Sequence, residues 1–520
     1  MTDTVEGTSP ATARVAPPGP APTKDAPAGP SRQWWVALLC ITAAAAALRL
    51  FAVSRHSFWY DEAVTAAVAE QSVGSLFTGE TKDNGNPPLY WILARFWMLA
   101  FGNSEVAMRS LPVILGVASV PVMGLLGRRL LGPAAGLAAA ALLAVSPLEI
   151  ELANEARAYA LQALLVILST WLFVRWTDRR GWGALVAYAV SVSLACYTHY
   201  FSFFVPLAHG AALLLSREHR RLLPAWVGGM VLAALLWSPW LPAFWEQLRT
   251  PGNLSRMGDR WKLQFFATPV TFAVGRTFAW RDASKIMLLV ALGGAMAAFW
   301  LPAAVGLLRS RRWFVGGLLL AWLALPVVLP LAAALAGKPL YHTRAASVAV
   351  PAFLLLLAAG LVRMAAAPRY AAVAVIGVMT AVSLYRYASL PLKDDWRAAA
   401  PPVLAGLQAG EVLLFDTDIE VTSFRYYAQK SGVMPQTMIG LTRGADPQGQ
   451  LWGIRHANGV RVDRDEKEQG ESVWSAQGIW VLLCVPASSS EEYRQLIESR
   501  GYRLVGSDEA HRIDVLHFRK

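Results

Sequence analysis

The chain has 520 residues, of which 55% are apolar and 16% are charged. Soluble domains carry about 25% charged residues, so this composition excludes a soluble enzyme and a disordered scaffold. The three cysteines have no CxxC or metal-type spacing, which excludes a protein built on disulfides. The net charge of +12 does not indicate nucleic acid, because most of the Lys and Arg lie in short clusters between apolar runs.

The chain opens with a polar tail and continues as a series of apolar segments. Residues 1–33 are rich in Pro, Ala, Thr and Gly, and we expect them to form a disordered cytoplasmic tail. Residues 34–390 contain eleven apolar segments close to the ~20 residues that a membrane-crossing helix needs. These segments lie near 34–54, 110–127, 132–150, 158–176, 182–197, 200–216, 222–241, 285–308, 313–336, 345–366 and 370–389. The sequence therefore predicts an α-helical polytopic membrane domain with about eleven transmembrane helices.

Basic clusters indicate how these helices are oriented. Arg128-Arg129 and the other clusters of arginine between spans all fall on one side of the predicted membrane. The positive-inside rule makes that side cytoplasmic. The loops 55–109 and 242–284 and the segment after residue 390 are then extracytoplasmic.

The last part of the chain, residues 391–520, is less apolar and contains more charged residues. The expected elements are buried strands at 411–416 and 478–486, an amphipathic helix at 488–500, and further strands at 502–506 and 513–519. This pattern predicts a small extracytoplasmic α/β domain. It has no Gly-rich loop before a helix, so nucleotide binding has little support.

The strongest candidate for chemistry is the acidic pair Asp61-Glu62, which follows three aromatic residues just beyond the first span. It begins an amphipathic stretch, 62–77, that we expect to lie along the membrane interface. Adjacent carboxylates repel each other, so one of them can have a raised pKa and act as a proton acceptor. The alternative is that both acidic residues only stabilise the first turn of a helix.

Further polar residues gather at the outer ends of the predicted spans. They are Asn86 before Pro87-Pro88, the run Glu155-Ala156-Arg157-Ala158-Tyr159, and the run Tyr341-His342-Thr343-Arg344. Each also has a plainer interpretation as a helix start, a cap or a headgroup anchor. Because Glu155 and Arg157 emerge on the same side of the membrane as Asp61, the two loops can line one cavity.

The order of these motifs resembles a known family. The motifs are Asp61-Glu62, Asn86-Pro87-Pro88-Leu89-Tyr90, Phe101-Gly102-Asn103-Ser104-Glu105 with Arg109, Gly127-Arg128-Arg129-Leu130, Ser146-Pro147 leading to Glu155-Ala156-Arg157-Ala158-Tyr159-Ala160, and Lys393-Asp394-Asp395-Trp396-Arg397. The series is similar to that of the bacterial polyprenyl-phosphate-sugar-dependent glycosyltransferases of the GT-C fold. Their relatives include the protein O-mannosyltransferases (family 39) and the lipid A aminoarabinose transferases (family 83). The resemblance covers about residues 34–390.

The resemblance implies an inverting transfer of a sugar from a polyprenyl-phosphate donor to an acceptor hydroxyl, at the outer face of the bacterial cytoplasmic membrane. It implies that Asp61 is the general base and that Glu62 shapes the same catalytic site. The implied substrate-binding residues are Asn86, Glu155, Arg157, Tyr159, His199, Tyr200, Tyr341, His342 and Arg344. Arg157, His199 and Arg344 are the candidates to stabilise the leaving phosphate. Asn86 stands where many relatives carry His or Lys, so another cation must take that role.

The expected partners are the lipid-linked donor, the bilayer, and a glycan, lipid or protein acceptor, with no nucleic acid. No cofactor is certain, although two or three of the carboxylates could hold one divalent metal ion. Two other functions compete with the transferase: a transporter or flippase of lipid-linked sugars, and a non-catalytic membrane scaffold for the C-terminal domain. Transporters place ionisable residues near the bilayer midplane and often contain inverted repeats. The acidic residues here cluster in outer loops and no repeat is evident, which favours the enzyme.

Overall fold

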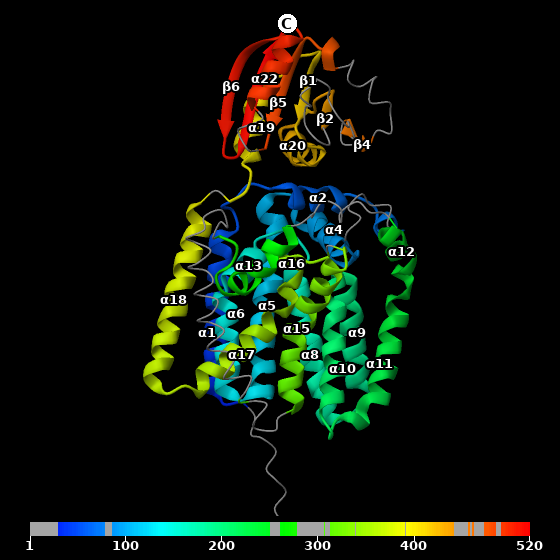
Figure 1. Cartoon of the computed structure of the whole chain (residues 1–520), viewed down its shortest axis with the longest axis vertical. Helices are drawn as coiled ribbons and strands as arrows, with labels where there is room; N and C mark the ends of the chain where they lie inside the picture. Colours follow the sequence, from blue (N-terminus) through cyan, green and yellow to red (C-terminus); the bar gives the residue numbers. More distant parts are fainter. Residues whose placement is uncertain are drawn as a thin grey trace, which may run out of the picture.

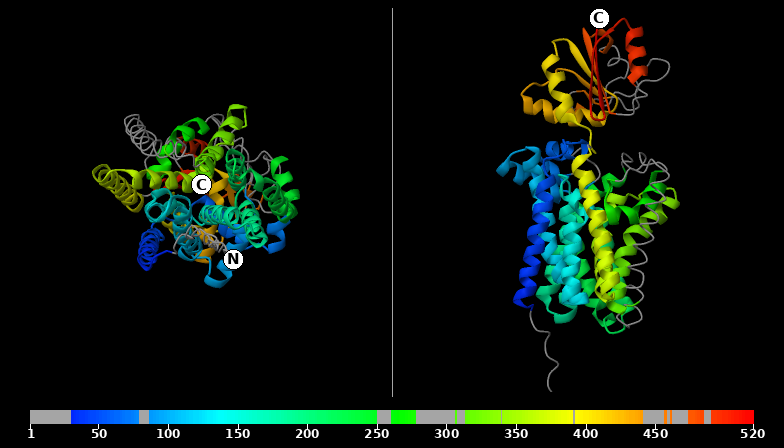
Figure 2. Two further views of the ribbon diagram at one scale, coloured as in Figure 1. Left: turned by 90° about the horizontal axis from the view of Figure 1, so that it is seen from below. Right: turned by 90° about the vertical axis from the view of Figure 1, so that its left-hand side faces the viewer.

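The computed structural model describes residues 30–78, 86–249, 260–277, 306, 313–338, 340–390, 392–440, 456–457, 460–461, 473–484 and 490–520. A bundle of helices forms one end of the molecule, and a small α/β domain that contains the C-terminus forms the other (Figure 1). The side view shows that the segment after the last long helix joins the two parts (Figure 2). The exact domain boundary expected near residue 390 stays a prediction.

Long apolar helices form the bundle. Within the described ranges, seven helices are long and apolar enough to cross a membrane, or eight if the bent pair α6 and α7 is one span. The seven are α1 (Arg32–Ala52), α5 (Glu105–Leu131), α8 (Tyr159–Arg179), the run Arg220–Arg249, α15 (Trp313–Leu335), the run Thr343–Arg363 and α18 (Ala366–Ser389). The run Arg220–Arg249 contains η2 (Arg220–Leu222), α11 (Leu223–Trp237), η3 (Ser238–Trp240) and α12 (Leu241–Arg249). The run Thr343–Arg363 contains α16 (Thr343–Ala346), η4 (Ser347–Ala349) and α17 (Val350–Arg363).

Shorter helices correspond to the remaining predicted spans. They are α6 (Pro133–Val145), α7 (Pro147–Ala153), α9 (Trp182–Thr198), η1 (Tyr200–Phe203) and α10 (Phe204–Leu215). The segments 182–197 and 200–216 thus form separate helices on either side of His199, as the sequence suggested. The expected span at 285–308 lies outside the described residues except for position 306, and so does the tail before residue 30. The first helix begins at Arg32, where the Ser31 hydroxyl accepts a hydrogen bond from the Trp34 amide at 3.2 Å.

Small residues allow these helices to pack closely. Lipid tails are as apolar as leucine, so helices in a membrane associate through close van der Waals packing rather than through the hydrophobic effect. The crossing of α5 and α6 shows this. A Cβ atom at Gly136 would lie 2.6 Å from the backbone of Arg128 and of Gly124. The two helices can therefore meet only with glycine at this position.

Short helices cover the end of the bundle that faces the α/β domain. They are α2 (Tyr60–Ala69), α3 (Val73–Thr78), α4 (Leu89–Phe101) and α13 (Arg260–Val274). Of these, α2 runs across the end of the bundle beneath the α/β domain (Figure 1). The amphipathic stretch 62–77 is divided into α2 and α3. The division occurs where the Ser72 hydroxyl caps the second helix by accepting a hydrogen bond from the Ser75 amide.

The α/β domain is built on one mixed sheet with the strand order β4-β3-β2-β1-β5-β7-β6. Its elements are α19 (Trp396–Gly406), β1 (Glu411–Phe415), α20 (Asp418–Ser431), β2 (Met438–Gly440), β3 (His456–Ala457), β4 (Val460–Arg461), β5 (Gly478–Leu483), α22 (Ser490–Ser499), β6 (Arg503–Ala510) and β7 (Ile513–Arg519). Strand β1 pairs in parallel with β2 and β5, while β7 is antiparallel to β5 and β6. Strands β1 and β5 lie at the centre of the sheet. Both are fully buried, as the sequence predicted. Helix α20 packs on α2, which brings the domain onto the end of the bundle.

Candidate active site

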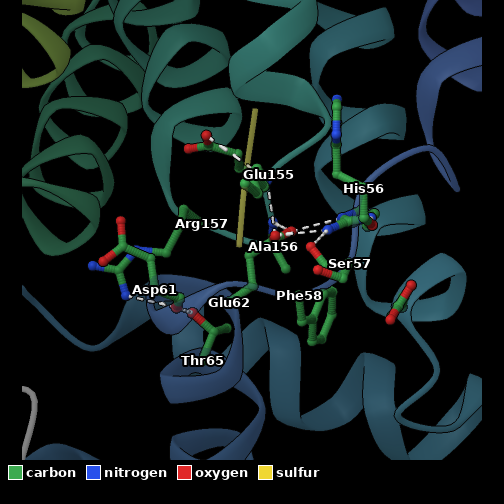
Figure 3. A network of polar contacts seen from close by, with 12 residues as sticks. His56, Ser57, Phe58, Asp61, Glu62, Thr65, Glu155, Ala156 and Arg157 are labelled. Atoms are coloured by element: carbon green, nitrogen blue, oxygen red, sulfur yellow. Dashed lines mark hydrogen bonds and ion pairs between the residues drawn. The ribbon is translucent and has the colours of Figure 1, made fainter. Parts of the chain in front are cut away.

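The acidic pair lies in the first turn of α2, but its two side chains face different surroundings. Successive residues of a helix point ~100° apart, so the side chains of Asp61 and Glu62 diverge. Figure 3 shows Glu62 beside Ala156 and Asp61 beside Arg157. The two carboxylates therefore have separate partners.

The Glu62 carboxylate is fully buried and held by cations. Arg109 donates two hydrogen bonds to it, from Nε to Oε1 and from Nη2 to Oε2, both at 2.7 Å. Lys393 donates to Oε2 at 2.9 Å and the Ala156 amide donates to Oε1 at 3.1 Å. Burial alone would raise the pKa of Glu62, but Arg109 and Lys393 outweigh burial and hold the pKa below its usual value. Glu62 is therefore a fixed anion whose two oxygens are already engaged.

Asp61 is more accessible than Glu62. Its side chain is 21% exposed, and Oδ2 accepts a hydrogen bond from Arg344 Nη1 at 2.6 Å. Arg157 approaches from the other side and donates to the backbone carbonyl of Asp61 at 3.3 Å. Burial would raise the pKa of the Asp61 carboxyl, but Arg157 and Arg344 hold the pKa below its usual value. Asp61 is thus an ionised carboxylate that solvent, and hence a substrate, can reach.

Glu155 and Glu151 extend the cluster through an arginine from a distant segment. Arg276 Nη2 donates to Glu155 Oε1 at 2.6 Å, and Arg276 Nε donates to Glu151 Oε2 at 3.1 Å. The preceding residue, Gly275, has a φ of +76°, and a Cβ atom there would lie 2.3 Å from Glu151 Oε1. Only glycine lets the backbone approach the carboxylate so closely, and the Arg276 amide then donates to both oxygens of Glu151.

The second oxygen of Glu155 faces the centre of the cluster. Oε2 is buried, makes no hydrogen bond within the described residues, and lies 3.9 Å from Arg344 Nη1. Its partner oxygen, Oε1, lies 4.0 Å from Lys393 Nζ. Burial would raise the pKa of Glu155, but Arg276, Lys393 and Arg344 hold it well below its usual value. Arg344 therefore joins the Asp61 and Glu155 carboxylates, which brings two segments predicted from the sequence into one site.

Positive charge exceeds negative charge in this cluster. Its cations are Arg109, Arg157, Arg276, Arg344 and Lys393, and its carboxylates are Asp61, Glu62, Glu151 and Glu155. The Trp59 ring faces two of the cations, with Arg344 at 4.5 Å and Lys393 at 5.6 Å from its centre. Cations held in fixed positions with one positive charge in excess suit an anionic ligand.

Tyr341 and His342 support Arg344 rather than join the charged network. His342 caps α16, because its Nδ1 accepts a hydrogen bond from the Arg344 amide at 3.1 Å. The Tyr341 hydroxyl is 2.6 Å from the Thr268 hydroxyl. This hydrogen bond connects α13 to the turn that carries Tyr341 and His342. Burial first, and then the neighbouring Arg344, lowers the pKa of His342 to about 3, so the ring is neutral near pH 7.

His199 and Tyr159 lie beside Arg157, with their ring centres 5.9 Å apart. Burial first, and then Arg157, lowers the pKa of His199 to about 4, so His199 supplies a neutral ring rather than a cation. The Tyr200 hydroxyl instead donates to Gln247 and accepts from Trp240, beside α12. Asn86 is half-buried just before α4.

Sequence reasoning missed four members of the network, which are Arg109, Glu151, Arg276 and Lys393. Arg109 and Lys393 belong to motifs that carry the family resemblance, yet nothing in the sequence assigns them a role. Arg276 belonged to no motif, and the only signal for it is the glycine that precedes it. Among the described residues, no group of three His, Cys, Asp or Glu side chains is arranged to hold a metal ion.

Comparison with known proteins identifies the fold of this chain. Residues 85–243 match the family model of the dolichyl-phosphate-mannose-protein mannosyltransferases. ArnT from Cupriavidus metallidurans, solved with undecaprenyl phosphate bound, is 14% identical with a TM-score of 0.59, over 94% of this chain and 98% of that chain. In the apo state the same protein is 16% identical with a TM-score of 0.60, over 93% of this chain and 98% of that chain. The chain has the GT-C fold. The predicted fold, a helical membrane bundle of the GT-C type with a small C-terminal α/β domain, is therefore confirmed. The predicted number of about eleven spans stays a prediction.

A second solved structure shares this fold. The oligosaccharyltransferase of Archaeoglobus fulgidus, tethered to an acceptor peptide, is 14% identical with a TM-score of 0.54, over 86% of this chain and 69% of that chain. A comparison with curated protein sequences gives no match. At these identities the structures establish the fold of the GT-C chain, while the roles of its residues follow from its own geometry.

Proposed function

We propose that this GT-C chain transfers a sugar from a polyprenyl-phosphate donor to an acceptor hydroxyl, with inversion at the anomeric carbon. The observation that carries the proposal is the contact of the accessible Asp61 carboxylate with Arg344 at 2.6 Å, in a cluster with excess positive charge. Such a site offers a proton acceptor beside a binding position for a phosphate anion. Support comes from a protein of the same fold that is solved with undecaprenyl phosphate bound.

The proposed reaction is a single displacement. The acceptor oxygen attacks the anomeric carbon while Asp61 takes the proton of the hydroxyl. The bond between the anomeric carbon and the phosphate oxygen breaks at the same time, and its electron pair leaves with the polyprenyl phosphate. A positioned base is needed because an alcohol is a poor nucleophile while it keeps its proton. No covalent intermediate with the enzyme forms.

Arg344 is the proposed ligand of the leaving phosphate. Its guanidinium is 18% exposed and reaches both Asp61 and the buried Glu155 oxygen, so a phosphate that enters the site would compete with Asp61 for it. Binding of the donor would then loosen the ion pair that restrains the base. Arg157 adds a second positive charge beside Asp61. These arginines supply the charge that Asn86 lacks.

The site lies at the end of the bundle that carries the α/β domain (Figure 1). We propose that this end is extracytoplasmic and that the chain resides in a bacterial cytoplasmic membrane, with its N-terminal tail inside. The acceptor is then a glycan, a lipid or a protein exposed on the outer face. Accessibility mapping of tags at the two termini tests this orientation, and a cytoplasmic Lys520 would refute it.

The Asp61→Asn variant tests the function. Asparagine keeps the size of the side chain but accepts no proton, so turnover should fall at least ~10²-fold, the usual contribution of a general base. The assay is transfer by the purified protein from a panel of hexose- and pentose-bearing polyprenyl phosphates, with donor affinity measured in parallel. Asp178→Asn is the matched control, because that carboxylate is 50% exposed and pairs with Arg129 at the opposite end of the bundle. Near wild-type turnover in Asp61→Asn would refute the role of Asp61, and transport of lipid-linked sugar without transfer would refute the transferase.

A further inference from the structure

The segment that carries the acidic pair is held by residues of the C-terminal domain as well as by the bundle. The Ser57 hydroxyl donates to the Asp394 carbonyl at 2.6 Å. Arg397 Nη2 donates to the His56 carbonyl at 3.0 Å. The Phe58 amide donates to the Tyr427 hydroxyl at 2.7 Å. Three consecutive residues, 56–58, are thus bonded to the domain that begins near residue 391.

The same domain also forms hydrogen bonds to the start of α5, the helix that carries Arg109. Both Arg397 and the Tyr427 hydroxyl donate hydrogen bonds to the Glu105 carboxylate. The Tyr426 hydroxyl donates to the Asn103 carbonyl at 2.8 Å, and its ring packs against Phe58 with the centres 4.8 Å apart. The C-terminal domain therefore connects the segment before α2 to the start of α5. Glu62 lies in the first turn of α2 after one of these segments, and Arg109 lies in the second turn of α5, so this connection adjoins both sides of the Glu62–Arg109 pair.

Lys393, at the start of the C-terminal domain, contacts the charged cluster directly. Its side chain is 9% exposed, and Nζ lies 2.9 Å from Glu62 and 4.0 Å from Glu155. Burying a lysine is unfavourable because the ammonium loses its hydration, and paired carboxylates offset this cost. The Glu62 and Glu155 carboxylates therefore allow Lys393 to be buried here. Burial lowers the pKa of Lys393, while the Glu62 carboxylate opposes this and favours the ammonium form.

We infer that Lys393 is a positioning residue of the active site and that the C-terminal domain is an obligatory part of that site, because together they fix residues 56–62 and hence the base at Asp61. This inference rests on the proposed transferase function. Glu62 follows Asp61 in the same helical turn, so a tether on Glu62 restrains Asp61 as well. Displacement of a catalytic group by ~1 Å can lower a rate ~10²-fold.

The test compares four variants of the full-length protein in lipid nanodiscs. Lys393→Met removes the ammonium but keeps an unbranched side chain, and Lys393→Arg restores a cation. Tyr427→Phe removes only the hydroxyl that accepts from the Phe58 amide. Lys520→Met is the matched control, because Lys520 is an exposed lysine of the same domain that contacts Trp474 and Tyr502. For each variant we would measure the transfer rate, the donor affinity and the hydrogen exchange of amides 56–62.

The expected results separate positioning from donor binding. Lys393→Met should lower the transfer rate ~10²-fold, with a much smaller change in donor affinity, and should speed exchange at residues 56–62. Lys393→Arg should recover most of the rate. Tyr427→Phe should speed exchange at the Phe58 amide and lower the rate to a lesser extent. Lys520→Met should match the wild type in all three measurements.

Three outcomes would overturn the inference. One is a wild-type transfer rate in Lys393→Met, and another is unchanged exchange at 56–62 in both Lys393→Met and Tyr427→Phe. The third is an equal loss of rate in Lys393→Met and Lys393→Arg with unchanged exchange. If Lys393→Met fails to fold, Tyr427→Phe decides by the same measurements. If the wild type transfers no sugar, the proposed function fails, yet the exchange data still test the tether, because they do not depend on activity.

Discussion

Replacing Glu62 should mainly lower the stability of the folded protein, because Glu62 holds buried cations and does not take the proton of the acceptor. In Glu62→Gln the side chain keeps its shape, but its amide group presents N–H donors to Arg109 or Lys393, which are themselves donors. Those cations are 1% and 9% exposed, so water cannot replace the lost carboxylate. Removing one partner of a buried ion pair costs about 3–5 kcal/mol. We expect a loss of free energy of unfolding in this range.

The measurement is equilibrium unfolding of the purified protein in mixed micelles, monitored by a spectroscopic signal that reports tertiary structure. Glu498→Gln provides the control, because its pair with Arg494 joins side chains that are 40% and 48% exposed. An exposed pair of this kind contributes about 0–1 kcal/mol, so the control should unfold almost like the wild type. The difference between the two variants then reports the effect of burial.

One result would refute this reasoning. If Glu62→Gln unfolds like the wild type but transfers no sugar, while Asp61→Asn remains active, then Glu62 is the base. The hydrogen bonds from Arg109 and Lys393 would in that case serve to orient a reacting carboxylate. The assignment of the two roles within the acidic pair would be reversed.

Three other predictions follow from the same cluster. Arg344→Ala should weaken donor binding by about 1.5–3 kcal/mol, the range for a hydrogen bond to a charged group, and an unchanged donor affinity would leave Arg344 only a structural role. Gly275→Ala should lower the melting temperature and transfer, because its Cβ atom would lie 2.3 Å from Glu151 Oε1, and a variant as stable as the wild type would contradict this contact. The folded pKa of Glu62 is below its unfolded value, so its contribution to stability is present above about pH 4.5 and is lost as pH falls through the folded pKa. The melting temperature of the wild type should therefore fall on acidification more steeply than that of Glu62→Gln, and parallel curves for the two proteins would contradict the assigned shift.

The sequence by itself determined the class of protein and much of its architecture. Apolar runs of membrane-crossing length predict helices whatever they pack against, because a backbone in lipid must satisfy its own hydrogen bonds. The change in composition near residue 390 likewise revealed the separate α/β domain. The ordered motifs beginning at Asp61-Glu62 indicated the GT-C fold, which the structural comparisons confirm.

The tertiary structure alone decided which charged groups meet. Arg344 is 283 positions from Asp61, and Lys393 is 331 positions from Glu62, so no local pattern predicts either contact. The same holds for Arg276, whose approach depends on the packing of α13 against α7. The two acidic residues are neighbours in sequence, and there only the family resemblance distinguished their roles. Only the direction in which α2 faces the bundle buries one carboxylate among cations and leaves the other within reach of a substrate.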